Sequence, residues 1–460
     1  MQNQVIEAFK QLVGAEYVLT GKEDLLCYSY DATPGFSHMP DAVIIPGTTD
    51  EVAKVLALAN SEKIPVYPRG SGTNLSAGTV PMKGGIVLLM TRFAKIIEID
   101  AANLVATAEP GVIVATLNAA VGEFGLIYPP DPGTVATATL GGTVSENAGG
   151  LRGLKYGVSK HYIMGLEIVL ADGRIIQTGG KNVKDVAGYD LTKLFTGSEG
   201  TLGVITKVTV KLVPAPEASK AMLAIFSDLD NAGKAISAII ANKIIPATLE
   251  IMDNATIRTV EDYAKVGLPV DAEAVLLIEV DGIPAVVEKE AAKVIEVLQA
   301  NGATAIQTAK DATERDKLWA ARRAALPALA KLRPTTFVED ATVPRSKVPD
   351  MIRAVNHAAA KHNVTIGTFG HAGDGNLHPT IVCDIRDAAE MERVHAAMDE
   401  IFATAIKLGG TLSGEHGIGL GKLKYMEDQF GPASMSAMRA IKKALDPNCI
   451  LNPGKLVGEC

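Results

Sequence analysis

Short apolar runs alternate with segments of helical periodicity along the chain, which is typical of a mixed α and β protein. Residues 2–16 carry apolar side chains at helical spacing and predict an N-terminal helix. Residues 42–45 and 64–67 predict strands. Between them, Thr48 and Thr49 lead into a predicted helix whose first turn holds Asp50 and Glu51, because acidic side chains favour the first helical turn. Together they form a β-α-β unit that ends in a glycine-rich loop.

The next two segments, residues 84–115 and 165–213, are short β-rich runs separated by turn-forming residues. The pair Asp172-Gly173 predicts a hairpin turn in the second segment. The alternating pattern stops at Pro214, and PAPEAS at 214–219 predicts a domain boundary.

Beyond this boundary the order strand, helix, strand occurs twice in succession. Two such units on a mixed sheet predict a ferredoxin-like α+β domain. Residues 346–365 and 387–408 predict further helices, with a strand–loop–strand segment between them.

Composition and charge narrow the possible partners. The 460 residues are 47% hydrophobic with a formal net charge of −8, which excludes a largely disordered chain and disfavours nucleic acid as the main partner. No apolar run reaches about 18 residues, so we expect no transmembrane helix. The N-terminus lacks the features of a secretory signal. The expected location is the cytoplasm, with peripheral attachment to the inner membrane left open.

The four cysteines, Cys27, Cys383, Cys449 and Cys460, include no CxxC pair. Their spacing predicts thiols rather than a zinc site, an iron–sulfur site or a disulfide framework.

A glycine-rich loop, PRGSGTNL at 68–75, follows a predicted strand. Its glycines allow positive φ and let backbone N–H groups point at an anion, so the loop is a candidate cradle for a pyrophosphate. A glycine-rich turn without a ligand is the alternative. The loop matches neither GxGxxG leading into a helix nor GxxxxGK[ST].

Two further segments are rich in glycine and small residues. The first is PPDPGT at 129–134 running into TLGGTVSENAGG at 139–150, and the second is GSEGTLGVI at 197–205. Such a segment cannot build a core by itself, which suggests backbone packed directly against a large flat ligand. For 197–205, a simple turn into a strand is an equal alternative.

In this order and spacing, the three segments resemble the FAD-binding domain of the vanillyl-alcohol oxidase/p-cresol methylhydroxylase superfamily, over roughly residues 38–215. The resemblance implies a fold that holds FAD between two α+β subdomains. Many members attach FAD through a His in the first loop, but residues 68–78 contain none. We therefore expect FAD to be bound non-covalently.

The resemblance also implies which residues bind FAD. Those expected around the pyrophosphate are Pro68, Arg69, Gly70, Ser71, Gly72, Thr73 and Asn74. Those expected along the flavin and its chain are Pro132, Thr134, Gly141, Gly142, Ser145 and Asn147, with Gly203 and Ile205 near the adenine.

His371 and His378 flank Gly373-Asp374-Gly375-Asn376, which favours a turn. A strand–turn–strand would place both imidazoles side by side, whereas one straight strand would put them on opposite faces. Two imidazoles and a carboxylate form a common open site for a divalent metal, and Glu415 is the candidate third ligand. The adjacent His416 could reach a substrate instead. The alternative is two loop histidines that flank a turn and bind nothing.

HxGDGNxHP followed by GEHGIG resembles the C-terminal domain of FAD-linked 2-hydroxy-acid dehydrogenases, over roughly residues 216–460. This group includes D-lactate dehydrogenases, the glycolate oxidase large subunit and D-2-hydroxyglutarate dehydrogenase. The resemblance implies that His371, His378 and Glu415 bind one divalent metal, which would be Fe, Zn or Mn.

By the same resemblance, His416 is the base that removes a substrate proton. Arg322, preferred over Arg323, binds the substrate carboxylate in two parallel hydrogen bonds. Asn452 returns to the flavin domain.

We expect the α+β fold class, with a two-subdomain FAD-binding domain of the vanillyl-alcohol oxidase type plus a ferredoxin-like α+β substrate domain. The expected parts are an N-terminal helical arm (1–37), the FAD-binding domain (38–215), a substrate and metal domain (216–425) and a C-terminal segment that returns to the FAD domain (426–460).

The expected activity is FAD-dependent oxidation of a small D-2-hydroxy acid, with D-lactate to pyruvate preferred and glycolate or D-2-hydroxyglutarate as alternatives. Val338 aligns near a Lys of the hydroxyglutarate enzymes and cannot pair a second carboxylate, which favours a small monocarboxylate.

No second redox centre is recognisable in the sequence, so we expect electrons to pass to a partner protein. The family resemblance implies that this partner is an electron-transferring flavoprotein or an iron–sulfur subunit. Two rival hypotheses are a metal-dependent hydrolase without flavin, and a flavoprotein that mainly transfers electrons within a complex.

Overall fold

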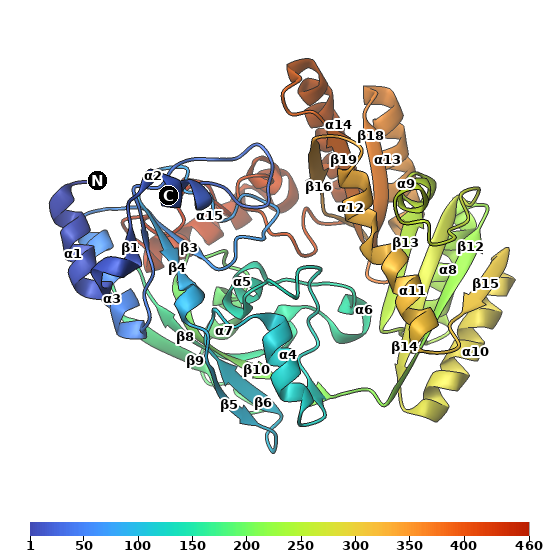
Figure 1. Ribbon diagram of the computed structural model, residues 1–460, viewed down its shortest axis with the longest axis horizontal. Coiled ribbons are helices and arrows are strands. Elements are labelled where there is room, and N and C mark those ends of the chain that lie inside the picture. The colour runs from blue at the N-terminus through green and yellow to red at the C-terminus, as the bar shows by residue number, and fades with distance from the viewer. Residues whose placement is uncertain (460) are drawn as a thin grey trace. The chain divides into compact units, whose positions relative to one another are not determined.

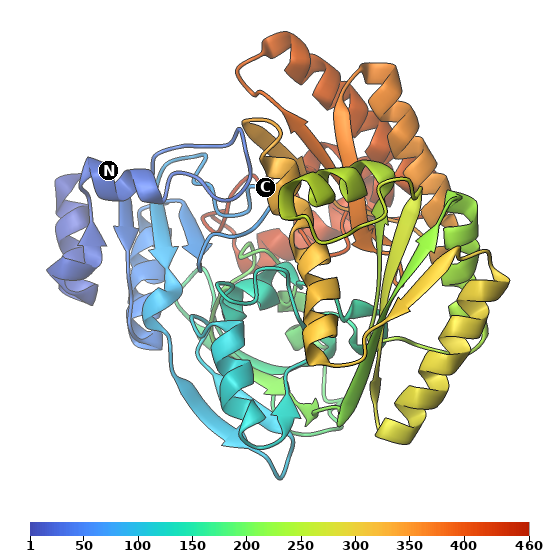
Figure 2. The ribbon, with the colours of Figure 1, turned by 45° about the vertical axis from the view of Figure 1, so that its right-hand side comes forward.

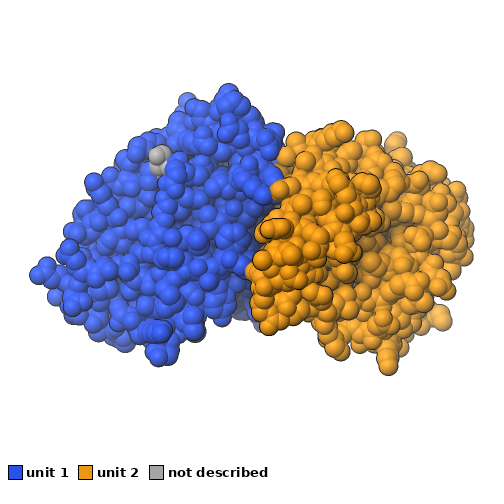
Figure 3. All heavy atoms as spheres, turned by 90° about the horizontal axis from the view of Figure 1, so that it is seen from above, with its two compact units in different colours: residues 1–149, 158–215, 415–460 blue, residues 150–157, 216–414 orange. Residues whose placement is uncertain are grey.

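The chain forms two compact units in the computed structural model, which describes residues 1–459. Unit 1 consists of residues 1–149, 158–215 and 415–460, and unit 2 consists of residues 150–157 and 216–414 (Figure 3). The four-part division expected from the sequence stays a prediction, and the units divide the chain differently around residues 150–157 and after residue 414.

Unit 1 contains three sheets (Figure 1). The first has the order β1 (Val18–Leu19), β2 (Ala42–Ile44), β4 (Ile86–Leu89), β3 (Val66–Arg69). The second, fully antiparallel, has the order β5 (Ile96–Asp100), β6 (Val105–Ala108), β10 (Val204–Lys211), β8 (Ile163–Val169), β9 (Ile175–Gly179). The third pairs β7 (Leu126–Ile127) with β11 (Val213–Pro214).

The helices of unit 1 are α1 (Asn3–Val13), α2 (Lys22–Cys27), α3 (Thr49–Ser61), α4 (Val114–Gly122), α5 (Leu140–Glu146), α7 (Leu191–Phe195) and α15 (Met426–Leu445). Helix α3 begins as predicted, because the Thr48 side chain accepts a hydrogen bond from the Glu51 N–H at 3.2 Å. The predicted β-α-β elements are confirmed. However, the two strands are not neighbours, since each pairs in parallel with β4 between them.

The core of the first sheet joins the two ends of the chain. Phe9 of α1 is completely buried against α3 and the sheet. Near the C-terminus, the Val66 N–H donates to the Ile450 carbonyl at 2.7 Å, and the Asn452 N–H donates to the Val66 carbonyl at 2.8 Å. Residues 450–452 therefore extend the edge of the sheet beside β3.

Unit 2 is built on one antiparallel sheet. Its order is β15 (Ala305–Thr308), β12 (Ala218–Phe226), β14 (Ala274–Gly282), β13 (Thr248–Asp253), β18 (Thr365–His371), β19 (Asn376–Cys383), β16 (Thr335–Val338), and β17 (Ala341–Thr342) also pairs with β19. The first four strands in this order have the arrangement of a ferredoxin-like sheet, in which the second and third strands of the chain are neighbours.

The helices of unit 2 are α6 (Gly153–Tyr156), α8 (Leu229–Ala241), α9 (Asn254–Ala264), α10 (Pro284–Ala300), α11 (Ala312–Arg323), α12 (Ala325–Ala330), α13 (Val348–His362) and α14 (Ala388–Lys407). Helices cover both faces of the sheet (Figure 2). Each face of the sheet has its own hydrophobic core, and successive residues of β12 point into different cores. Met222 packs with α8 and α10, and Leu223 packs with α9 and α11.

Segment 150–157 joins unit 2 through Asp281 of β14. The Lys155 ammonium donates to the Asp281 carbonyl at 2.6 Å, and the Tyr156 hydroxyl donates to Asp281 Oδ2 at 2.7 Å. These long-range bonds place a short piece of the sequence-defined FAD domain in the other unit.

The cysteine expectation is only partly right. Cys27 and Cys383 are free thiols, but Cys449 is disulfide-bonded, so the prediction of a thiol is wrong there. Cys460 lies outside the described residues. Among residues 1–459, no helix is long and apolar enough to cross a membrane.

Replacing Phe9 with Ala should lower the free energy of unfolding of unit 1 by about 3–5 kcal/mol, because the ring leaves a cavity in the core. The matched control is Phe124→Ala, whose ring is 54% exposed and whose loss should change stability by no more than about 0.5 kcal/mol. Calorimetric unfolding compares the two variants. Equal effects would show that α1 does not stabilise the sheet.

Candidate functional site

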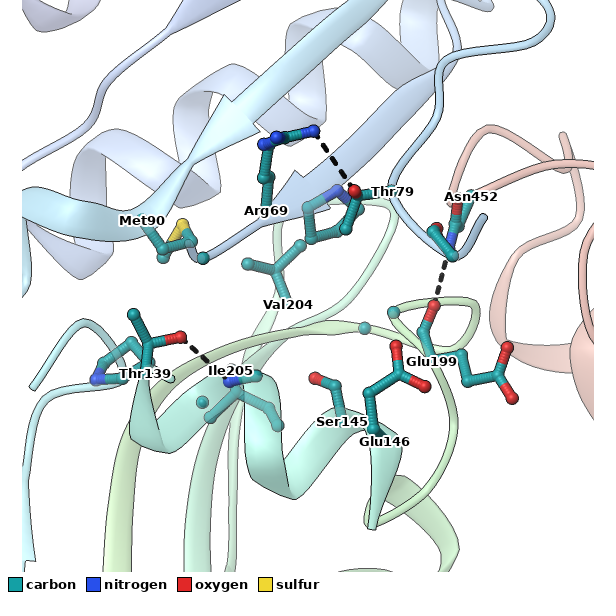
Figure 4. A pocket seen from close by; sticks show the side chains of 18 residues that line it. Arg69, Thr79, Met90, Thr139, Ser145, Glu146, Glu199, Val204, Ile205 and Asn452 are labelled. Atoms are coloured by element: carbon teal, nitrogen blue, oxygen red, sulfur yellow. Dashed lines mark hydrogen bonds between the residues drawn. The ribbon is translucent and has the colours of Figure 1, made fainter. Parts of the chain in front are cut away.

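A pocket in unit 1 lies where the end of β3, helix α5, the start of β10 and the C-terminal segment meet (Figure 4). Small residues and backbone form much of its wall, with Met90, Val204 and Ile205 as apolar sides and Thr79, Thr139 and Ser145 as hydroxyl groups. Such a wall suits a ligand with both flat apolar and polar parts.

Nine of the residues expected to bind FAD line this pocket: Pro68, Arg69, Gly70, Gly141, Gly142, Ser145, Gly203, Ile205 and Asn452. The other seven, Ser71, Gly72, Thr73, Asn74, Pro132, Thr134 and Asn147, are not among its lining residues. Two of these have structural contacts instead. The Asn147 side-chain oxygen accepts the Lys160 N–H at 2.8 Å, and Thr33 donates its hydroxyl to the Asn74 carbonyl at 3.4 Å.

The Arg69 side chain ties the first loop to the N-terminal part of unit 1. Its Nη1 donates to the Tyr30 carbonyl at 2.7 Å and to the Thr79 hydroxyl at 3.2 Å. Burial lowers the pKa of this guanidinium, although nearby Asp31 opposes the effect. Any contact of this loop with a phosphate would therefore involve mainly its backbone.

Asn452 joins three segments of the pocket wall. Its Nδ2 donates to the Gly78 carbonyl at 2.9 Å and to the Glu199 carbonyl at 2.6 Å. Its Oδ1 is buried and has no hydrogen-bond partner within residues 1–459. A buried acceptor that lines a pocket without a donor is suited to a ligand that brings one.

In unit 2, the strand–turn–strand predicted around the histidines forms as β18 and β19. His371 lies opposite Asn376 in the register, and His378 is two residues further along β19, so both rings lie on the same face. The ring centroids are 5.0 Å apart and nearly perpendicular. Gly375 has φ +88°, a conformation that the turn requires and that side chains disfavour.

Glu250 of β13, which the sequence analysis missed, lies behind this pair. Its Oε1 is 2.6 Å from His371 Nδ1, and its Oε2 accepts from Arg322 Nε at 2.7 Å. Burial alone would raise the pKa of Glu250, but the charges and hydrogen bonds of His371 and Arg322 outweigh it and hold the pKa below its usual value. A carboxylate on Nδ1 leaves Nε2 for a metal, which is the common arrangement around ligating histidines.

The two arginines considered for the substrate carboxylate differ in position. Arg322 is mostly buried, bonds Glu250 and lies over the Phe369 ring with its Cζ 4.6 Å from the centroid. Arg323 is exposed and donates to the Asp316 carbonyl at 3.2 Å. Only Arg322 belongs to the histidine cluster.

The remaining expected residues, Glu415 and His416, begin the last segment of unit 1. Glu415 packs against Gly149 of the same unit, where an added side-chain carbon would lie 3.0 Å from its Oε2. In unit 2, the Gly414 N–H donates to Asp340 Oδ2 at 2.9 Å, which anchors the residue just before Glu415.

Two family models match most of the chain. The FAD binding domain matches residues 40–179, and the FAD linked oxidases, C-terminal domain, matches residues 215–456. The chain belongs to the FAD-linked oxidases. It is 53% identical to the glycolate oxidase subunit GlcD of Bacillus subtilis, over 98% of this chain and 96% of that protein. It is 34% identical to a D-lactate dehydrogenase of Anaerostipes hadrus, over 98% and 97%.

Solved structures confirm the expected fold class. p-Cresol methylhydroxylase superposes with a TM-score of 0.83 at 20% identity, covering 99% of this chain and 97% of that one. The 4-ethylphenol oxidase of Gulosibacter chungangensis gives 0.81 at 19% identity, covering 99% and 97%. The protein is thus an FAD-linked oxidoreductase with the vanillyl-alcohol oxidase fold, and the unit 1 pocket with its unsatisfied Asn452 acceptor fits FAD.

Replacing Glu250 with Ala should lower the free energy of unfolding of unit 2 by about 3–5 kcal/mol, because the Arg322 charge would stay buried without its anion. Glu288 is the matched control, since it pairs with Lys220 at an exposed position and its loss should cost at most about 1 kcal/mol. Chemical denaturation followed by the fluorescence of Trp319, in unit 2, measures both. A Glu250→Ala effect as small as the control's would contradict the importance of this pair.

Proposed function

We propose that this protein oxidises a small 2-hydroxy acid to the corresponding 2-oxo acid, with FAD as the first electron acceptor. The cluster of His371, His378, Glu250 and Arg322 carries the proposal. It combines two imidazoles suited to a metal with a guanidinium suited to a carboxylate, on one face of one sheet. The rival hydrolase without flavin is disfavoured by membership in an FAD-linked family.

Glycolate and D-lactate are the two substrates to be distinguished. The higher identity to a glycolate oxidase subunit favours glycolate, whereas the sequence motifs predict D-lactate. Val338 supports a small substrate of either kind. It pairs with Thr380 on β19, two residues from His378, and offers no charge for a second carboxylate.

Arg322 would bind the substrate carboxylate. Its Nε is held by Glu250, which fixes the plane of the guanidinium and directs its terminal nitrogens. His416 would accept the proton of the hydroxyl group. FAD, when bound, supplies the acceptor for the hydride from Cα.

A divalent metal would be held by His371, His378 and Glu415, and would supply Lewis acidity toward the substrate hydroxyl. Two observations support this assignment. Glu250 sets the tautomer of His371. Gly414, which is covalently bonded to Glu415, is anchored to Asp340 in the unit that carries both histidines.

Non-covalent FAD and a separate redox partner complete the proposal. The lack of His in residues 68–78 supports non-covalent attachment. The lack of a CxxC pattern supports transfer of electrons to a partner protein, either an electron-transferring flavoprotein or an iron–sulfur subunit. Rapid reduction of NAD by the isolated protein would contradict this.

The deciding experiment is an anaerobic visible spectrum of the purified holoenzyme before and after addition of substrate. Flavin bands that bleach with glycolate or D-lactate, but not with L-lactate, are expected. D-2-hydroxyglutarate belongs in the panel and should bleach the bands slowly if Val338 excludes a second carboxylate. Bands that no 2-hydroxy acid changes, with metal restored and partner present, would overturn the proposal.

His378→Ala should reduce the rate of flavin reduction by more than about 100-fold. Loss of a residue that only orients a metal ligand typically costs about 10–100-fold, and loss of a ligand itself should cost more. FAD content should stay that of the wild type, because His378 lies in unit 2 and the FAD pocket in unit 1. His395→Ala, at an exposed position on α14, is the control and should keep the full rate. Loss of both rate and FAD in the first variant would mean that His378 is structural.

A chelator should have the same selective effect. Dialysis against it should slow substrate-driven reduction and leave the flavin bands in place, and one of Fe, Zn or Mn should restore the rate. Full activity of protein shown by elemental analysis to be metal-free would exclude the metal site.

A further inference from the structure

Two acidic residues that the reaction above does not use, Glu146 and Glu199, are among the residues that line the FAD pocket of unit 1 (Figure 4). Glu146 is the last residue of α5, and Glu199 lies in the loop between α7 and β10. Gly417 packs against both: an added side chain there would collide with the Glu146 carboxylate and lie 3.0 Å from Glu199 Oε1. The two carboxylates are therefore close neighbours.

Burial raises the pKa of Glu199 above its usual value, but two backbone donors and two lysines oppose this rise. Its two carboxylate oxygens accept the Ile418 and Gly419 N–H groups, each at 2.7 Å. Lys455 and Lys422 add positive potential. Hydrogen bonds to both oxygens favour the ionised form of a buried carboxyl group.

The surroundings of Glu146 favour its neutral form. Burial raises its pKa well above the usual value, and the negative charges of Glu199 and Asp31 raise it further. Of the charged groups around it, Lys455 opposes this shift. The Lys455 ammonium donates hydrogen bonds to the Gly78 and Val80 carbonyls, at 2.8 and 2.6 Å. Burial lowers the pKa of Lys455 to about 7.

We propose that Glu146 faces the FAD pocket as a neutral carboxylic acid that donates a hydrogen bond to the cofactor, while Glu199 carries the negative charge of the pair. Two carboxylates this close favour a single shared charge, and the backbone donors place it on Glu199. A neutral carboxyl group has an O–H to donate, whereas an ionised one can only accept hydrogen bonds. The proposal depends on FAD binding and not on which acid is oxidised.

The test is the dissociation constant of FAD, measured by flavin fluorescence on the apoprotein from about pH 6 to pH 9. In the wild type, the dissociation constant should rise as Glu146 ionises, by up to about tenfold per pH unit, because FAD binding then requires uptake of one proton. Glu146→Gln keeps a donor and removes the charge, so its constant should stay within about threefold of wild type near neutral pH. It should rise less with pH than the wild type, keeping only the part of the rise that comes from loss of the Lys455 charge. Glu123→Gln, at an exposed position in unit 1, is the matched control and should follow the wild type.

A second readout is the infrared spectrum of the FAD complex. The stretching band of a protonated carboxyl group should be present in the wild type and in Glu123→Gln, and absent in Glu146→Gln. Glu199→Gln removes the neighbouring charge and should move the loss of FAD affinity to lower pH. If that variant fails to fold, the infrared comparison still decides the assignment.

The outcomes separate this inference from the proposed function. FAD binding that does not depend on pH, or that depends on pH equally in Glu146→Gln and wild type, would overturn the inference and leave the oxidase proposal standing. Protein that binds no FAD at any pH would overturn both. Normal pH dependence with no bleaching by any 2-hydroxy acid would support the inference and contradict the proposed substrate class.

Discussion

The buried anion of Glu250 is the interaction on which the substrate-side cluster depends. It contacts His371 at 2.6 Å and Arg322 at 2.7 Å, and Arg322 lies over Phe369. Phe369 in turn lies beside His378, with ring centroids 5.7 Å apart, and the two histidine rings are in contact. The five side chains thus form a closed ring of contacts, in which no member can move without disturbing the next.

Unit 1 depends in a similar way on polar groups that join segments distant in the sequence. Asn452 bonds the carbonyls of Gly78 and Glu199, and Glu199 bonds the backbone of residues 418 and 419. Small residues form the pocket wall, so there is little side-chain packing to fix its shape. These side-chain to backbone bonds supply the rigidity that packing supplies elsewhere.

Local chemistry explains what could be predicted from the sequence. The turn between His371 and His378 forms as expected, because its residues determine the bend without help from the rest of the chain. The helix cap at Thr48 is likewise local. The family resemblance supplied the vanillyl-alcohol oxidase type of fold that the solved structures confirm, whereas the order of strands and helices supplied the ferredoxin-like arrangement in unit 2.

Long-range pairing explains what could not be predicted. Glu250 is 121 residues from His371 and meets it only because β13 and β18 are neighbours in the sheet. The available signal was an acidic residue between Leu249 and Ile251, in a strand that also ends in Asp253. The family resemblance implies that Pro132 and Thr134 contact the flavin. Neither is among the lining residues of the pocket, and that assignment stays a prediction. The assignment of 150–157 to unit 2 depends on the distant Asp281.

Because the ribosome makes the chain from the N-terminus, the contacts of unit 1 with its last segment can form only late in synthesis. Unit 1 contains the first 149 residues, but its last segment begins only at residue 415. Until residues 418 and 419 have emerged, the Glu199 carboxylate lacks both of the backbone donors that hold it, and the edge of β3 lacks residues 450–452. The half of the protein that is translated first is therefore completed last, and a nascent chain that stops short of its final segment would carry an unfinished cofactor pocket.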